Sequence, residues 1–195
     1  KFKELVPIQS YEDLKPYIDE VMQGEADVLW NTPIQWFAKS SGTTSDKSKF
    51  IPLSQESIED NHFQGSKDVL GIYYNALPES DLLTGKMLVI GGSHQVHPIK
   101  DDIQYGDLSA VLLQNSPIWS GLVRVPELSI ALMDEWESKI EMLAQSTIQE
   151  PVTSIAGVPT WTMVLLKRIL QITGKKTIKE VWPDFELYIH GGVSF

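Results

Sequence analysis

Hydroxyl side chains, one glycine and two lysines are concentrated in residues 40–49, and these residue types suit the binding of an anion. Gly42 lets the backbone approach an oxyanion closely, because it has no Cβ. The hydroxyls and the loop N–H groups can donate hydrogen bonds to phosphate oxygens, and a lysine can balance the charge. The cluster reads Ser40, Ser41, Gly42, Thr43, Thr44, Ser45, Asp46, Lys47, Ser48 and Lys49.

This cluster carries neither of the common nucleotide fingerprints, since G-x-x-x-x-G-K-[ST] and G-x-G-x-x-G do not occur in the chain. On composition alone, a flexible polar surface loop is the alternative reading, because such clusters commonly mark loops. The flanking residues 36–38 and 50–53 have the apolar character of strands. The sequence therefore predicts a loop that joins two strands.

Histidines and carboxylates give weaker signals. His94 and His97 follow an apolar strand and a glycine pair, where they can face a substrate, but two histidines without any cysteine or a defined third ligand do not specify zinc. We therefore predict no metal-binding residues. His190 is expected to be a core histidine. A solvated helix face is expected for Asp134, Glu135, Glu137 and Glu141.

Strand and helix patterns alternate along the chain. A capping box at Ser10 predicts a helix that ends near Gly24, Ser54 is expected to cap a helix over residues 55–77, and residues 101–107 are expected to form a loop. A helix over residues 126–145 is expected to start at Pro126, and another over 160–172 to end at Gly174. Further strands are predicted at residues 86–90, 152–156 and 185–189.

This alternation predicts an α/β fold with a layered, mainly parallel sheet flanked by helices, and no domain boundary inside residues 1–195. A chain that is 42% hydrophobic can bury a sizeable core. The formal net charge of -10 repels a phosphate backbone, so we expect no nucleic-acid partner, and an anionic substrate needs a local cationic site. Without a long apolar run or a signal peptide, we expect a cytoplasmic protein with no membrane partner.

Ordered motifs carry a family resemblance over essentially the whole chain. They are residues 37–52, 92–96, 105–110, 156–161 and 190–195. The first, a strand, Ser-Ser-Gly-Thr-Thr, a basic residue and a strand, resembles the phosphate loop of the adenylate-forming superfamily of acyl-CoA synthetases and luciferases. The whole set resembles the bacterial branch of the auxin-responsive promoter family, whose plant members are acyl-acid-amido synthetases. Several motifs in order are more specific than a single loop.

The resemblance implies a two-step ligase that uses ATP and Mg²⁺. A small carboxylic acid attacks the α-phosphate of ATP to give an acyl-adenylate and pyrophosphate, and an amine such as an amino acid then displaces AMP. A carboxylate is a poor electrophile, so the protein must align two anions and neutralise their charge. Mg²⁺ shares that neutralisation.

The resemblance also implies roles for individual residues. Ser40, Ser41, Gly42, Thr43 and Thr44 would bind the β- and γ-phosphates. Lys49 stands where the superfamily carries its loop lysine, but an extra residue before it leaves Lys47 open as the alternative. The adenine side would comprise Gly191, Gly192, Val193 and Ser194, against the alternative of an ordinary strand-end turn. The acyl pocket would comprise Val158, Pro159, Thr160, Trp161 and His94, with core packing as the alternative for Trp161.

The chain has no initial methionine and stops directly after a predicted strand, so we expect a fragment. The resemblance implies that residues 1–195 are a partial N-terminal ATP- and acyl-acid-binding domain, inactive alone, with the second ATP motif and the C-terminal lid following Phe195. A non-catalytic module that binds a small acid or a partner on the same fold is the competing class. Acyl transfer to a thiol such as CoA is a third possibility.

Overall fold

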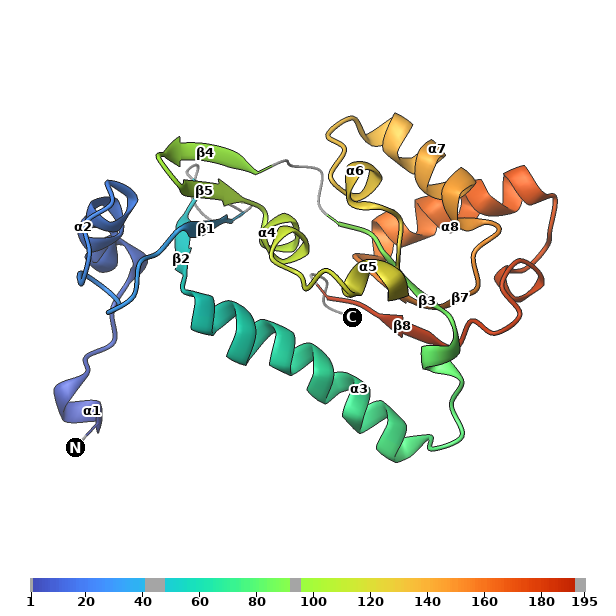
Figure 1. Cartoon of the computed structure of the whole chain (residues 1–195), viewed down its shortest axis with the longest axis horizontal. Helices are drawn as coiled ribbons and strands as arrows, with labels where there is room; N and C mark the ends of the chain where they lie inside the picture. The colour runs from blue at the N-terminus through green and yellow to red at the C-terminus, as the bar shows by residue number, and fades with distance from the viewer. Residues whose placement is uncertain (1, 41–47, 92–95, 192–195) are drawn as a thin grey trace. The chain divides into compact units, whose positions relative to one another are not determined.

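The computed structural model describes residues 2–40, 48–91 and 96–191 (Figure 1). The chain divides into two compact units. The first unit comprises Lys1–Gly65 and Val96–Val111, and the second comprises Ser66–Gln95 and Leu112–Phe195. One unit holds a mixed sheet and the other a parallel sheet, so the predicted α/β class is confirmed. The prediction of a single partial domain stays a prediction.

Helix α2, Tyr11–Met22, follows the short helix α1, Phe2–Leu5, and begins at the capping box that the sequence predicted. The Asp13 N–H donates to the Ser10 hydroxyl at 3.2 Å, and the Ser10 N–H donates to the Asp13 carboxylate at 2.8 Å. These bonds satisfy backbone donors that the first helical turn leaves without helical partners. Gly24 follows the helix with a φ of 92°, a conformation that favours glycine.

The sheet of the first unit contains four short strands in the order β2-β1-β5-β4. Strand β1 is antiparallel to β2 and parallel to β5, and β4 is antiparallel to β5. Its strands are β1 Trp36–Lys39, β2 Phe50–Leu53, β4 His97–Lys100 and β5 Ile103–Gly106. The buried side chains of Ile18, Val21, Ile34, Phe37 and Ile103 form its core with α2.

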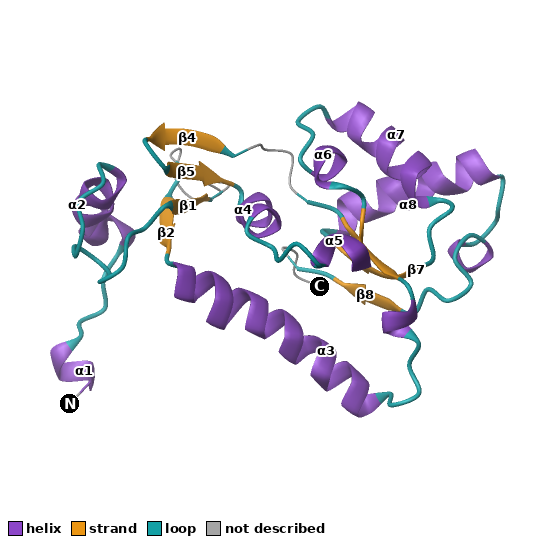
Figure 2. Ribbon diagram, viewed as in Figure 1, coloured by secondary structure: helices purple, strands orange, loops and turns teal. Residues whose placement is uncertain are grey.

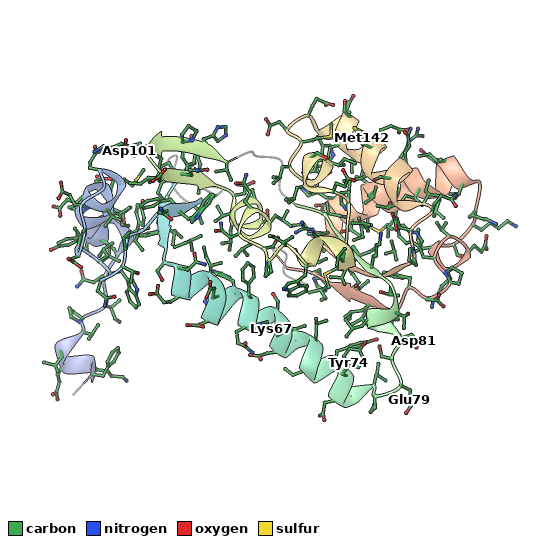
Figure 3. The ribbon with its side chains drawn as sticks, in the orientation of Figure 1. Lys67, Tyr74, Glu79, Asp81, Asp101 and Met142 are labelled. Atoms are coloured by element: carbon green, nitrogen blue, oxygen red, sulfur yellow. The ribbon has the colours of Figure 1, made fainter. Side chains whose placement is uncertain are left out.

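The predicted loop over residues 101–107 is wrong, because most of those residues belong to a β-hairpin. Asp101, labelled in Figure 3, turns the chain between β4 and β5 with a φ of 46°. Aspartate tolerates this left-handed conformation better than most residues do. The two adjacent aspartates therefore mark the turn alone, and Ile103–Gly106 pairs as a strand.

A long helical element follows β2, as the sequence predicted. The π-helix η1, Ser57–Phe63, continues directly into α3, Gln64–Ala76. The Ser57 N–H donates to the Ser54 hydroxyl at 3.1 Å, so Ser54 caps the element as expected.

The sheet of the second unit is wholly parallel, with the order β6-β3-β7-β8. Its strands are β3 Lys86–Val89, β6 Arg124–Val125, β7 Val152–Ala156 and β8 Leu187–Ile189. Helices α7, Trp136–Thr147, and α8, Pro159–Thr173, lie side by side (Figure 2). Their side chains Leu143 and Leu165 are buried in the core with the strands. Met142, labelled in Figure 3, lies on the exposed side of α7. The shorter helices are η2 Leu82–Thr84, α4 Leu108–Gln114, α5 Ser120–Val123, α6 Leu128–Ala131 and η3 Ile178–Glu180.

The end of α8 agrees with the sequence. Gly174 adopts the left-handed conformation with a φ of 64°, and its N–H donates to the Leu170 carbonyl at 3.0 Å. This arrangement satisfies a carbonyl of the last helical turn.

The prediction of one helix from Pro126 to residue 145 is wrong. Pro126 follows Val125 through a cis peptide bond at the end of β6, and α6 and α7 are separate helices. The Glu135 carboxylate accepts hydrogen bonds from the N–H groups of Glu137 at 3.0 Å and Ser138 at 2.6 Å. Because an acceptor placed before a helix satisfies its first donors, Glu135 starts α7 well inside the predicted span.

These bonds give the stability of the protein a pH dependence. Hydrogen bonds from Ser138, then from Glu137, hold the pKa of Glu135 below its ordinary value. The stabilisation is therefore complete above the unfolded pKa of about 4.3 and is lost as the pH falls through the lower folded pKa. We expect Glu135→Gln to have a lower Tm than wild type at pH 7, and the difference to shrink below about pH 4. Thermal unfolding followed by circular dichroism across this range checks the prediction, and a difference that is constant with pH would contradict it.

Candidate functional site

Ser40 and Lys49 close the base of the predicted phosphate loop, between β1 and β2. The Ser40 N–H donates to the Lys49 carbonyl at 2.8 Å, and the Lys49 N–H donates to the Ser40 hydroxyl oxygen at 3.0 Å. A hydroxyl that accepts one hydrogen bond can still donate another, so Ser40 keeps a proton to offer a ligand. The other loop residues singled out by sequence, Ser41, Gly42, Thr43, Thr44 and Lys47, lie outside the described residues.

Tyr11 of α2 fixes the same place from a distant part of the chain. Its hydroxyl accepts a hydrogen bond from the Phe50 N–H at 2.9 Å and donates to the Phe50 carbonyl at 3.3 Å. The Lys49 Nζ lies 5.1 Å from the centroid of the Tyr11 ring, within cation–π range. Tyr11 therefore orients both the start of β2 and the lysine at the end of the loop.

A second lysine lies on a tyrosine ring at this end of the sheet. The Lys39 Nζ lies 5.6 Å from the centroid of the Tyr105 ring, and the His97 ring packs on Tyr105 with a centroid distance of 5.3 Å. In the register of β1 and β2, Lys39 is the partner of Phe50, next to Lys49. The loop base thus carries the local positive charge that an anionic ligand requires in a chain of net charge -10.

In the second unit, three parallel strands end at one edge of the sheet. The ladder continues past the strand ends, because the Ile90 N–H donates to the Ala156 carbonyl at 2.9 Å and the Gly157 N–H donates to the Ile189 carbonyl at 3.1 Å. Ligands of open α/β sheets bind beyond the carboxyl ends of their strands. Gly91, Gly157 and Gly191 follow these ends, and we call this place the carboxyl edge.

Gly157 makes the tightest contacts at the carboxyl edge. A Cβ on Gly157 would lie 3.0 Å from the Ile90 Cβ and 3.1 Å from the Thr162 hydroxyl oxygen. The Tyr188 hydroxyl donates to the Gly157 carbonyl at 2.9 Å and lies 3.3 Å from the Thr162 hydroxyl. Strand β8 and helix α8 therefore hold the junction that follows β7, and a side chain at Gly157 would require its neighbours to shift by a few tenths of an ångström.

The residues predicted for the acyl pocket begin α8 beside this junction. Val158 precedes the helix and Pro159 is its first residue. Trp161 is 45% exposed, and its ring centroid lies 4.1 Å from that of Trp136. The two rings are tilted by 52°, so the Trp161 indole packs against Trp136 while nearly half of its surface remains exposed. Thr160 is exposed, and His94 lies outside the described residues.

Gly191, predicted for the adenine side, and His190 both follow strand β8. Gly191 is exposed at the carboxyl edge, while Gly192, Val193 and Ser194 lie outside the described residues. The expectation of a core histidine at 190 is wrong, since His190 is exposed and packs on the Tyr188 ring at 5.2 Å. A side chain at a strand end can point past the sheet, where the core does not cover it.

The predicted solvated helix face is correct in part. Asp134 and Glu135 are exposed but precede α7, and Glu137 is exposed on the helix. Glu141 is half-buried and pairs with Arg168 at 2.6 Å. Across residues 2–40, 48–91 and 96–191, no group of three or more His, Asp or Glu side chains could hold a metal ion. In the same ranges, no helix combines the length and apolar character needed to cross a bilayer.

Comparison with known proteins gives one family for the whole chain. Residues 1–195 match the GH3 family N-terminal domain. The indole-3-acetic acid-amido synthetase GH3.15 of Arabidopsis thaliana is 26% identical over 198 residues, covering 94% of this chain and 30% of that protein. The jasmonoyl-L-amino acid synthetase JAR6 of Nicotiana attenuata is 42% identical over 59 residues, covering 30% of this chain and 10% of that protein.

One more relative and one solved structure also match this chain. The 4-substituted benzoates-glutamate ligase GH3.12 of Arabidopsis thaliana is 43% identical over 63 residues, or 32% of this chain and 11% of that protein. The structure of AtGH3.15 acyl acid amido synthetase in complex with 2,4-DB superposes with a TM-score of 0.69 at 21% identity, over 88% of this chain and 30% of that chain. The fold is therefore shared, and the chain spans less than a third of the length of these relatives.

Proposed function

Because this chain belongs to the GH3 family by its match to the N-terminal domain, we propose that the full-length protein is an ATP-dependent acyl-acid-amido synthetase. The relatives that it resembles are named as an indole-3-acetic acid-amido synthetase, a jasmonoyl-L-amino acid synthetase and a 4-substituted benzoates-glutamate ligase. The proposed substrates are accordingly a small carboxylic acid, ATP and an amine such as an amino acid. The bacterial branch and the cytoplasmic location remain predictions of the sequence alone.

The observation that carries the proposal is the loop base. The Ser40 N–H donates to the Lys49 carbonyl, the Lys49 N–H donates to the Ser40 hydroxyl, and Tyr11 contacts both Lys49 and Phe50. This base carries two donors to an anion, the Ser40 hydroxyl and the Lys49 amino group. Such preorganised donors bind phosphate oxygens without first having to be ordered.

Each part of the reaction has proposed residues on this chain. The triphosphate would be bound by Ser40, Ser41, Gly42, Thr43, Thr44 and Lys49. The adenine would lie against Gly191, Gly192, Val193 and Ser194, and the acid against Val158, Pro159, Thr160, Trp161 and His94. Mg²⁺ on the phosphates would supply further charge neutralisation for the attack on the α-phosphate. Aligning the acid with that phosphate is the main contribution of the protein.

Trp161 narrows the class of acid. A partly exposed indole that packs at a tilt against Trp136 offers apolar aromatic surface beside the carboxyl edge. Such a surface favours acids with an aromatic or extended apolar body, because stacking and apolar burial both contribute to binding. We therefore expect aryl acids to be better substrates than acetate.

Pyrophosphate exchange in the full-length protein tests the proposal. Benzoic, indole-3-acetic, jasmonic and acetic acids are each supplied with ATP, Mg²⁺ and labelled pyrophosphate, and exchange into ATP is expected only with an acid present. Mass spectrometry of the products with an amino acid or CoA then distinguishes an amide from a thioester. Absence of exchange across a wide acid panel would contradict the adenylating activity and favour a binding module.

A further inference from the structure

Lys139 is completely buried in α7, with 0% of its surface exposed. Lysine is almost never fully buried unless its amino group has polar partners, because desolvation of that group is costly. Its neighbours on the helix, Ile140 and Leu143, belong to the hydrophobic core of the second unit. A lysine at this position therefore has a cost in stability that an apolar residue would avoid.

The amino group of Lys139 lies at the carboxyl edge. Its Nζ is 3.3 Å from the carbonyl oxygen of Gly91, the residue that follows β3 and Ile90. Gly91 is itself buried, and a Cβ there would lie 3.1 Å from the Leu113 side chain. The buried lysine thus joins α7 to the backbone at the end of the strand.

The same amino group leads to the predicted acyl pocket. The Lys139 Nζ lies 5.9 Å from the centroid of the Trp136 ring, and that ring lies 4.1 Å from the ring of Trp161, centroid to centroid. One chain of contacts therefore runs from Gly91 through Lys139 and Trp136 to Trp161. Of these four residues, Trp161 is the one that is substantially exposed.

We infer that Lys139 is a positioning residue for the acid, which holds the Gly91 carbonyl and the Trp136 ring in place so that Trp161 presents its face to the substrate. It does not touch the acid, because its side chain is buried. The inference rests on the proposed function and adds a residue to it. The competing explanation is that Lys139 contributes only to the stability of α7.

Lys139→Met in the full-length protein is the central variant. Methionine keeps an unbranched apolar stem of similar size but cannot donate a hydrogen bond. In pyrophosphate exchange, the KM for an aryl acid is expected to rise on the order of tenfold, the scale of a lost hydrogen bond from a charged group. The KM for ATP is expected to change by less than about twofold, because Lys139 is inferred to position the surface that meets the acid and not the nucleotide.

Thr147→Val is the matched control. Thr147 is also fully buried on α7, and its hydroxyl donates to the Leu143 carbonyl at 2.7 Å, within the helix. A purely structural role for Lys139 predicts that both variants lower Tm and leave the KM for the acid unchanged. If Lys139→Met does not fold, Trp136→Leu interrupts the same chain of contacts without removing the lysine and is expected to raise the same KM. An unchanged KM in the folded variant would overturn the inference.

A measurement without substrate separates this inference from the proposed function. Two indoles whose ring centroids lie 4.1 Å apart couple in circular dichroism, and the part of the signal due to the pair is the part that Trp136→Phe and Trp161→Phe both lose. Lys139→Met is expected to lose the same part, whereas Thr147→Val keeps it. If wild type exchanges with no acid, the proposed function fails while this signal still tests the positioning role. A retained signal in Lys139→Met would overturn that role.

Discussion

Replacing Lys49 with methionine is expected to lower pyrophosphate exchange by the full-length protein about 100-fold, the scale of removing one preorganised donor to a developing charge. The Lys49 backbone closes the loop with Ser40, and the substitution leaves those backbone groups in place. Methionine can also keep apolar contact with the Tyr11 ring, over which the Lys49 Nζ now lies at 5.1 Å. The loss would therefore report the missing charge rather than a broken loop.

Lys100→Met is the control for this result. The Lys100 amino group donates to the Gln23 carbonyl at 2.8 Å, and the residue lies at the turn end of β4, near the Asp101 turn. Strand register places that turn at the end of the sheet away from Lys39 and the loop base. Removing an equal charge there should leave exchange within about twofold of wild type, as expected for an exposed charge screened by solvent.

Lys47→Met distinguishes the two candidate lysines. A loss of about 100-fold in Lys47→Met, with normal exchange in Lys49→Met, would assign the phosphate contact to Lys47. Normal exchange in both single variants would contradict the proposed role of a loop lysine. Exchange is measured at several ATP concentrations, so that weaker binding and a slower chemical step are separated.

Trp182→Ala is expected to lower the free energy of unfolding by about 3–5 kcal/mol, the usual cost of truncating a buried tryptophan. Trp182 is only 2% exposed and lies in the core shared by the strands of the second unit, α7 and α8. Its indole N–H donates to the Thr147 carbonyl at 3.1 Å. The variant therefore opens a cavity and also leaves a buried acceptor without that donor.

Urea denaturation of the full-length protein measures this loss. Trp182→Phe keeps a large ring but not the N–H, so its loss should be smaller, and it separates the cavity from the hydrogen bond. Trp119→Ala removes an indole that is 60% exposed in the same unit and should cost less than about 1 kcal/mol. Equal losses in Trp182→Ala and Trp119→Ala would contradict the assignment of Trp182 to the core.

Sequence reasoning worked where the physical cause is local. The Ser10 and Asp13 side chains bond each other's backbone across three residues, and Gly174 ends α8 through its own conformation. Both features depend on residues within one turn of the helix end, so the residue types predict them.

Sequence reasoning failed where local signals compete. Pro126 suits a helix start, but Glu135 offers a carboxylate to the N–H groups of the following residues, and α7 begins there. The pair Asp101 and Asp102 signals a turn, but it does not reveal that the residues on either side pair as strands. Turn residues locate a change of direction and leave the length of the loop open.

The remaining site residues depend on contacts between distant parts of the chain. Tyr11 meets Phe50 across 39 residues, and Lys139 meets Gly91 across 48. The helical spacing of Trp136 and Leu143 puts Lys139 on the apolar face of α7, but that spacing does not identify the Gly91 carbonyl as its partner. Such residues become visible only once the fold brings the partners together.

The hydrogen bonds between Tyr11 and Phe50 also reduce the number of backbone donors that strand β2 can offer to another chain. Strand β2 is an edge of its sheet, and backbone groups of alternate residues point away from β1. The outward N–H of Phe50 is already bonded to Tyr11, and Pro52, the next outward residue, has no N–H. Along β2 this edge therefore offers no backbone donor to an incoming strand, which protects the protein against sheet extension and aggregation there.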